Sequence, residues 1–393
     1  MNFAFTTDEC DFDHADADRI GVLLINLGTP DACTRAAVRR YLREFLSDPR
    51  VVEMPRALWW PILHGFILTT RPRKTAAAYA KVWRADGSPL LTIARRQERK
   101  LRDEFAREFG VSTVNMTDAT NAANATNATH TTSAVQVELA MRYGNPSVGA
   151  ALAKLRRAGA RKLLVLPLYP QYCAATTASA FDAVAAELAR WRRVPAMRFI
   201  ANYHDRRGYI EALAASVRDH RRVHNDDGDA VLVMSFHGIP QQCFDAGDPY
   251  HCECHKTARL LAEELELSER EWRIGFQSRF GPKRWLRPYT DEVLAELARD
   301  GARAVQVICP GFSADCLETL EEIALRSREV FLCAGGERFA CIPCLNDRDD
   351  HIAALHDLIA DNIRDWLEAD RATDHATDRA TRKQRAMAMG ARA

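Results

Sequence analysis

The feature of this sequence that most constrains its fold is a regular alternation of short β-rich runs with amphipathic helical stretches. The first series contains the apolar runs 20–28, 135–144 and 161–170, and the second contains 229–238, 272–281 and 302–311. Most of these runs are followed by a segment with apolar residues at helical spacing. Strands that alternate with helices form right-handed crossovers and parallel sheets covered on both faces. The sequence therefore predicts an α/β fold with two doubly wound, Rossmann-like lobes.

Low-complexity segments mark the edges of this pattern. Residues 1–18 and 371–393 are polar and rich in Ala, so we expect mobile tails, and residues 112–134 resemble a surface insertion. The predicted lobes are 19–225 plus 346–370 for the first, and 226–345 for the second, which carries the metal site. At 393 residues the chain is long enough for two lobes of ordinary size.

Composition narrows the range of partners. The 54 basic and 53 acidic residues give a formal net charge of +1, so no global field gathers nucleic acid. No G-x-G-x-x-G follows a strand and no phosphate-binding P-loop occurs, which disfavours a nucleotide cofactor. The apolar run 57–70 is too short to span a bilayer, and the N-terminus is acidic rather than signal-like. We therefore expect a cytoplasmic protein.

Two strand ends carry groups that could perform chemistry. His237 ends the run 229–238, and Glu318, Glu321 and Glu322 follow the run 302–311 at spacings of three and four. An imidazole and a carboxylate from neighbouring strand ends can bind a divalent ion or move protons near neutral pH. The alternative is that His237 caps a turn and the glutamates form a solvated helix face.

Eight motifs point to a more specific reading. They are LLINLGTP (23–30), GSPL (87–90), MRYGNPSV (141–148), LPLYPQY with TTAS (166–179), SFHGIP (235–240), GDPY (247–250), FQSRFGPKRWLRPYT (276–290) and CPGFSADCLETLEEI (309–323). In this order the set resembles the ferrochelatase family over roughly residues 20–365. These lyases insert ferrous iron into protoporphyrin IX to form protohaem (haem b), the terminal step of haem biosynthesis.

The resemblance implies roles for individual residues. His237 and Glu318 match the catalytic and metal-binding pair that faces across the porphyrin, although which is the base and which holds iron stays open. The residues expected near the macrocycle are Ser88, Arg142, Tyr143 and Tyr169. Glu321 and Glu322 would continue an acidic path for iron or protons, with a solvated face as the alternative.

The resemblance also bears on the substrate and on the membrane. In the family, the stretch matching 57–70 forms a lip around the site, which suggests peripheral membrane contact. Members that use coproporphyrin tend to carry tyrosines where this chain has Leu27 and Asp31, so protoporphyrin is the expected substrate. Two alternatives stay open: insertion of cobalt or nickel into a related tetrapyrrole, and a non-catalytic haem or iron carrier with the same fold.

The cysteines suggest a second metal centre. Cys252 and Cys254 lie within the segment HCECH, and Cys243 precedes them by nine residues. Thiolates at this density can hold zinc or a [2Fe-2S] cluster, although C-x-C alone is a weak motif and unligated thiols are the alternative. No cysteine follows Cys344, so the cysteine-rich C-terminal extension of some ferrochelatases is absent.

Overall fold

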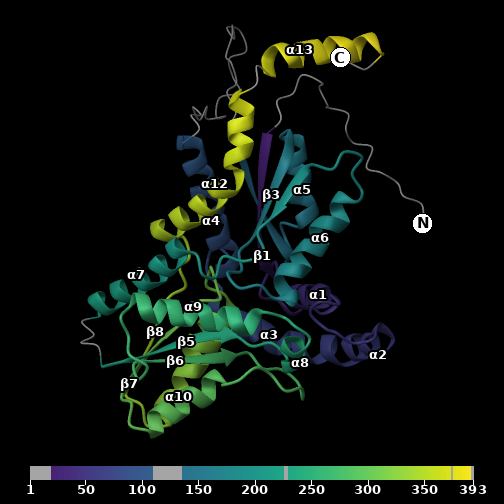
Figure 1. Cartoon of the computed structure of the whole chain (residues 1–393). Helices are drawn as coiled ribbons and strands as arrows, with labels where there is room; N and C mark the ends of the chain where they lie inside the picture. Colours follow the sequence, from purple (N-terminus) through teal and green to yellow (C-terminus); the bar gives the residue numbers. More distant parts are fainter. Residues whose placement is uncertain (1–18, 109–134, 225–228, 373–374, 391–393) are drawn as a thin grey trace.

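A computed structural model describes residues 19–108, 135–224, 229–372 and 375–390 (Figure 1). The predicted N-terminal tail, 1–18, and the predicted insertion, 112–134, lie outside these residues. The described chain forms two α/β lobes, each built on one four-stranded sheet.

The first sheet has the strand order β2-β1-β3-β4, with every pair parallel. Its strands are β1 (Arg19–Thr29), β2 (Val135–Gly144), β3 (Ala160–Pro167) and β4 (Ala196–Phe199). The second sheet has the order β6-β5-β7-β8, again all parallel. Its strands are β5 (Val231–His237), β6 (Trp272–Gln277), β7 (Ala304–Ile308) and β8 (Arg338–Cys341). The prediction of two doubly wound lobes is confirmed.

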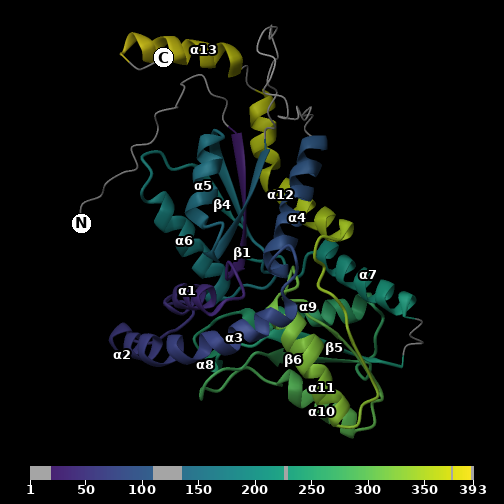
Figure 2. The ribbon, with the colours of Figure 1, turned by 180° about the vertical axis from the view of Figure 1, so that it is seen from behind.

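Helices cover the faces of both sheets (Figures 1 and 2). Those from the first part of the chain are α1 (Arg35–Leu46), α2 (Arg56–Pro61), α3 (Leu68–Val82), α4 (Pro89–Glu108), α5 (Val148–Arg157), α6 (Ser179–Leu188) and α7 (Arg207–Val223). The remainder are α8 (Gln241–Asp245), α9 (Tyr250–Glu264), α10 (Thr290–Arg299), α11 (Arg328–Cys333), α12 (Asp349–Ala372) and α13 (His375–Ala388). Local sequence sets some starts: the Thr34 hydroxyl accepts a hydrogen bond from the Ala37 N–H and caps α1.

Three helices have the wider i→i+5 hydrogen bonding of a π-helix. They are η1 (Ile62–Ile67), η2 (Ala174–Ala178) and η3 (Glu318–Ser327). The sequence predicts a helix at each of the first and last positions but not its type. Such helices are rare and often occur at functional sites.

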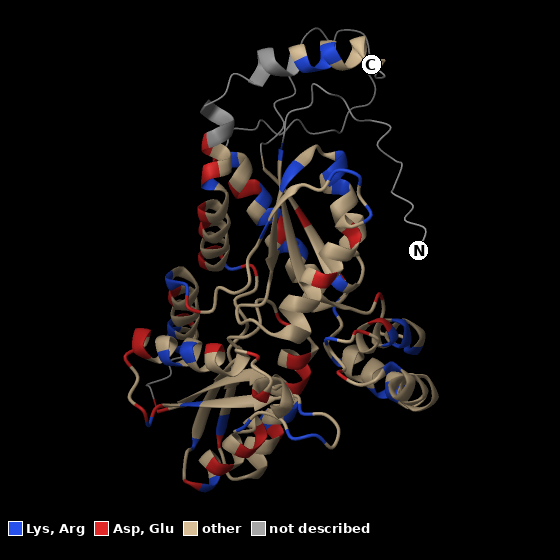
Figure 3. Ribbon diagram, turned by 45° about the vertical axis from the view of Figure 1, so that its right-hand side comes forward, with Lys and Arg blue, Asp and Glu red and all other residues tan. Residues whose placement is uncertain are grey.

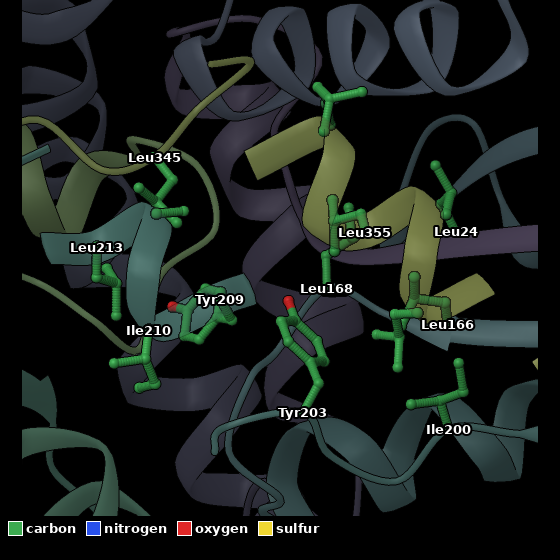
Figure 4. Close-up of a cluster of buried hydrophobic side chains, with 14 of the residues drawn as sticks. Leu24, Leu166, Leu168, Ile200, Tyr203, Tyr209, Ile210, Leu213, Leu345 and Leu355 are labelled. Carbon is green, nitrogen blue, oxygen red and sulfur yellow. The ribbon is translucent and has the colours of Figure 1, made fainter. Parts of the chain in front are cut away.

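The alternating side chains of β1 show how the layers pack. Ile20, Val22 and Leu24 belong to the cluster that α4, α7 and α12 cover, whereas Leu23 and Ile25 pack with α5 and α6. The first of these clusters continues into the second lobe, where Leu232 and Met234 of β5 belong to it. Figure 4 shows its centre, where Tyr203 and Tyr209 lie between Leu166 and Leu355 on one side and Leu213 and Leu345 on the other. One apolar core thus links the lobes and fixes how their strand ends face each other.

Two parts of the fold differ from the sequence expectation. The short edge strands β4 and β8 have only four residues each, and the periodicity did not indicate them. Residues 375–388 of the predicted mobile tail form helix α13. The lobe boundaries at 225 and 346 stay a prediction, although α12 packs on α4, α7 and β3 of the first lobe.

Candidate active site

The candidate site lies at the carboxyl ends of the second sheet, where ligands bind in open α/β sheets. His237 ends β5 and is paired in register with Gln277, which ends β6. The Gln277 Nε2 donates a hydrogen bond of 3.0 Å to the backbone oxygen of Glu318, the first residue of η3. His237 and Glu318 therefore lie at the same sheet edge, each next to Gln277.

Local backbone geometry presents the His237 imidazole. The next residue must be Gly238, because a Cβ there would lie 2.8 Å from the Gln277 carbonyl oxygen. The His237 Nδ1 lies 2.6 Å from the Gly238 carbonyl oxygen, which can only accept, so Nδ1 carries the proton. In the neutral ring Nε2 then keeps its lone pair. The ring of Phe312 flanks the imidazole at 6.4 Å between centroids.

Glu318 differs from the two glutamates that follow it. Within the described residues no cation forms an ion pair with the half-buried Glu318, whereas Glu321 pairs with Lys81 and Arg326. Glu322 accepts hydrogen bonds from the Ser278 backbone and side chain. A partly buried carboxylate without a cation attracts one from outside. Glu318 is therefore the carboxylate that is available to a metal ion.

Two tyrosines of the first lobe lie near Glu318. Burial raises the pKa of Tyr79, on α3, well above its ordinary value, and the nearby Glu318 carboxylate raises it further. The pKa of Tyr41, on α1, is raised by burial and then by Tyr79 and Glu318. Both phenols are therefore protonated at neutral pH. The site lies between the lobes, with its imidazole and carboxylate from the second and a tyrosine wall from the first.

Comparison with known proteins identifies the family to which this chain belongs. The ferrochelatase family model matches residues 19–363. The chain is 51% identical to the ferrochelatase of Nitrosococcus oceani, over 97% of this chain and 98% of that protein. It is 53% identical to the ferrochelatase of Aromatoleum aromaticum, over 91% of each chain. The chain belongs to the ferrochelatase family. It is accordingly an enzyme that inserts ferrous iron into protoporphyrin for haem synthesis.

A solved structure resembles the fold more distantly. SirB from Bacillus subtilis with Fe3+ has a TM-score of 0.49 and 11% sequence identity, over 87% of this chain and 94% of that chain.

The carboxylates expected to stack on one helix face are arranged differently. Because η3 has i→i+5 hydrogen bonds, residues three apart no longer stack as they do on an α-helix. Glu321 is buried, with its side chain 8% exposed, so a solvated face does not describe it. The iron or proton path through Glu321 and Glu322 stays a prediction.

The expected porphyrin contacts are engaged within the protein. Arg142 donates to Asp48 and to Ser179, and the Tyr143 hydroxyl donates to Asp48 at 2.8 Å. The expected contacts also include Ser88, which is buried and accepts from the Thr29 hydroxyl at 2.8 Å. Tyr143 belongs to the same apolar cluster as Tyr41 and Tyr79, and the contact of these residues with substrate stays a prediction.

Tyr169 is the expected contact that keeps an unused polar atom. Its hydroxyl is buried and has no hydrogen-bond partner among the described residues. Burial raises its pKa well above the ordinary value, and Tyr143 raises it further, so the hydroxyl stays protonated. It can therefore donate to a ligand.

The lip region has two apolar faces. Trp59, Leu63, Ile67 and Leu68 pack inward, whereas Leu58, Trp60, Ile62 and Phe66 are exposed. The segment projects from one side of the molecule in both Figures 1 and 2. A purely buried helix therefore does not describe 57–70. None of the helices within the described ranges combines the length and apolarity needed to cross a bilayer.

Arg71 is not among the residues that the sequence analysis singled out, yet the structure sets it apart. Its guanidinium carbon lies 3.8 Å from the ring centre of Phe280, across from the lip. Burial lowers its pKa, and no carboxylate of the described chain forms an ion pair with it. Figure 3 shows that charged residues of both signs are spread over both lobes, so an unpaired half-buried arginine is a local feature. Spacing alone could not separate Arg71 from its basic neighbours.

Among the residues that the structure describes, the cysteines are not gathered into the second metal centre that their spacing suggests. Cys252 is exposed and Cys254 is fully buried on α9, because residues two apart on a helix point in different directions. Burial raises the pKa of Cys243 to about 11, which disfavours the thiolate that a metal needs. The described residues contain no group of three or more His, Cys, Asp or Glu side chains suited to a metal ion. The three thiols do not fit a [2Fe-2S] cluster.

A cavity of about 570 Å³ lies beside the tyrosine wall. It is bounded by the ends of β1 and β2, by α1 and by Trp60, and Tyr41 lines it. Neither His237 nor Glu318 does. Leu317, immediately before Glu318, packs against the first-lobe cluster that contains Leu27 and Tyr79.

Proposed function

We propose that His237 and Glu318 perform the metal insertion, with Glu318 holding Fe²⁺ and His237 accepting pyrrole protons. The observation that carries this proposal is that both groups lie at one sheet edge, and that no cation of the described residues forms an ion pair with Glu318. The His237 Nε2 has a free lone pair because Nδ1 donates to Gly238. The Glu318 carboxylate has no cation, although both neighbouring glutamates are bonded.

Insertion replaces two pyrrole protons with one Fe²⁺, so the charge of the porphyrin core does not change. The carboxylate attracts the incoming ion and replaces part of its hydration shell. A neutral imidazole is a suitable general base. It accepts one pyrrole proton at its Nε2, releases that proton to water and then accepts the second. Proton removal exposes the nitrogen lone pairs that bind the iron. Ferrous iron is a substrate here, and no resident cofactor is needed for these steps.

The residues around the candidate site support protoporphyrin as the porphyrin substrate. The exposed apolar lip can cover the edge of an insoluble macrocycle that carries no propionates. No carboxylate of the described residues forms an ion pair with Arg71. A propionate at Arg71 would form a charge-assisted hydrogen bond. Coproporphyrin, with four propionates, would need further cations or donors. Leu27 packs with the apolar cluster that faces Leu317, where an apolar macrocycle edge fits better than a carboxylate.

Peripheral membrane contact is part of the proposal. Leu58 and Phe66 are 61% and 66% exposed, and basic residues follow in α3. An apolar surface flanked by base fits the interface of an anionic bilayer. Co-sedimentation with liposomes tests this, with Leu58→Ser/Phe66→Ser as the matched variant. Retained sedimentation of that variant would exclude the lip as the contact.

The decisive experiment follows protoporphyrin fluorescence after anaerobic addition of Fe²⁺. We expect the wild-type chain to quench it with turnover and Glu318→Gln to lose this activity. The matched control is Glu329→Gln, an exposed glutamate in the following helix α11, which we expect to act like wild type. A haem or iron carrier would bind product without turnover. Turnover with Co²⁺ or Ni²⁺ but not with Fe²⁺ would favour the alternative metals.

A further inference from the structure

An ion pair joins the two lobes beside the candidate site. The Lys81 Nζ lies 3.0 Å from the Glu321 Oε1, across 240 positions of sequence. Lys81 belongs to the last turn of α3 in the first lobe, and Glu321 belongs to η3 in the second. The same two helices carry Tyr79 and Glu318. The ion pair therefore spans the helices that bear the facing groups of the site.

The burial of Glu321 makes this pair more than a surface contact. Its side chain is only 8% exposed, and its other oxygen accepts from the Arg326 Nε at 2.8 Å. A buried carboxylate is costly unless its oxygens have partners. Without Lys81, Oε1 would lose its cation. Docking of η3 against α3 is what brings Lys81 to this oxygen.

Other anchors of η3 belong to the second lobe. The Ser278 backbone N–H donates to Glu322 at 2.9 Å, and the Gln277 side chain donates to the Glu318 carbonyl. These bonds fix η3 relative to β6, but they do not fix it relative to the tyrosine wall. Lys81 provides an anchor from the first lobe, two residues beyond Tyr79.

We propose that Lys81 and Glu321 are positioning residues, whose ion pair sets the position of Glu318 relative to the first-lobe wall of the porphyrin cleft. This inference rests on the proposed function of Glu318. Under this proposal Glu321 is not a binding site on an iron path, because a carboxylate that is paired with two cations attracts a third only weakly. Neither residue touches substrate. Their effect reaches the reaction through the placement of Glu318.

The test compares Lys81→Met, Glu321→Gln and the double variant in the anaerobic Fe²⁺ assay. We expect kcat/KM for Fe²⁺ to fall roughly ten- to hundredfold, as misplacement of a reacting group does. The KM for protoporphyrin should stay within about twofold, because the macrocycle contacts remain. The double variant should be no slower than the slower single variant, since both remove one interaction.

Lys256→Met is the matched control. Lys256 of α9 pairs with Asp205 at 2.5 Å, which also links second-lobe and first-lobe segments, but away from η3. We expect it to leave kcat/KM for Fe²⁺ unchanged. An equal loss in this control, or wild-type kinetics in folded Lys81→Met, would overturn the inference. Faster turnover would also overturn it, because the pair would then be a latch that delays entry. Failure of the wild type to metallate porphyrin would instead overturn the proposed function.

Discussion

The two lobes each place a polar cluster near the carboxyl ends of their sheet, and the two clusters are satisfied to different degrees. In the first lobe Arg142, Tyr143 and Ser179 all donate to one oxygen of Asp48. In the second lobe the His237 Nε2 has no hydrogen-bond partner and the Glu318 carboxylate has no cationic partner among the described residues. A satisfied buried cluster stabilises a fold, whereas an unsatisfied one is available to a ligand. The first cluster should thus govern stability and the second activity.

The largest expected effect comes from His237→Ala. Removal of the base should lower kcat for Fe²⁺ insertion by about 10²- to 10⁴-fold. The fold should persist because the ring lies at a strand end and is only partly buried. The measurement is the fluorescence assay together with thermal unfolding. Near-normal turnover in a folded variant would remove His237 from the mechanism and end the contrast between the clusters.

For Asp48→Asn we expect a large loss of stability and only a small loss of activity. Breaking a buried ion pair leaves Arg142 without its carboxylate, so the free energy of unfolding should fall by about 3 kcal/mol. Urea unfolding measures this change. The kcat of the remaining folded protein should fall far less than it does for His237→Ala. A variant as stable as wild type but inactive would place the Asp48 cluster in the reaction itself.

The pH dependence of stability provides a second check on Asp48. Burial acts to raise the pKa of Asp48, but hydrogen bonds from Ser179, the Arg50 backbone and Tyr143 hold that pKa below its ordinary value. An aspartate with a lowered folded pKa stabilises the fold above the unfolded value of about 3.9 and loses this contribution as pH falls through the folded value. The stability difference between wild type and Asp48→Asn should therefore be full at about pH 6 and shrink below about pH 4.

The contrast also explains what the sequence could predict. His237 was identifiable because an apolar run of seven residues ends in it and a glycine follows. The Asp48 cluster was not, since Asp48 lies 94 positions before Arg142 and no local pattern links them. The π-helical form of η3 was also not predicted, because the spacing of its residues was compared only with the α-helical period. Non-local contacts decide which polar atoms remain without partners.

The spacing of the cysteines shows the same limit of prediction from sequence. The segment HCECH is dense in ligands by composition, yet its position on a helix turns Cys252 outward and Cys254 inward. A loop with the same letters could have brought both thiols to one ion. Pattern reasoning placed His237 at the end of a strand, and the structure has it there. It failed where the backbone conformation decides direction.

The substitution Arg71→Met tests whether Arg71 binds a propionate of the substrate. Loss of one charge-assisted hydrogen bond should raise the KM for protoporphyrin roughly tenfold and leave kcat nearly unchanged. The control is the substrate: protoporphyrin with both propionates esterified should be used equally by variant and wild type. A loss that persists with the ester would mean that Arg71 acts through its packing on Phe280 rather than through a carboxylate.

The smallest expected effect belongs to Gln277, whose buried amide connects the satisfied and unsatisfied parts of the second lobe. Its Oε1 accepts from the Ser235 hydroxyl at 2.9 Å, and its Nε2 donates to the Glu318 backbone. Gln277→Met removes the bond to Glu318, so kcat should fall about fivefold, as expected for roughly 1 kcal/mol. Ser235→Ala leaves that bond intact and should alter the unfolding free energy while kcat stays near wild type. Both changes remove the Ser235–Gln277 hydrogen bond, but only Gln277→Met removes the bond to Glu318. Equal losses of kcat would therefore mean that the network acts as a whole, and the orientation of Glu318 would then not depend on this single amide.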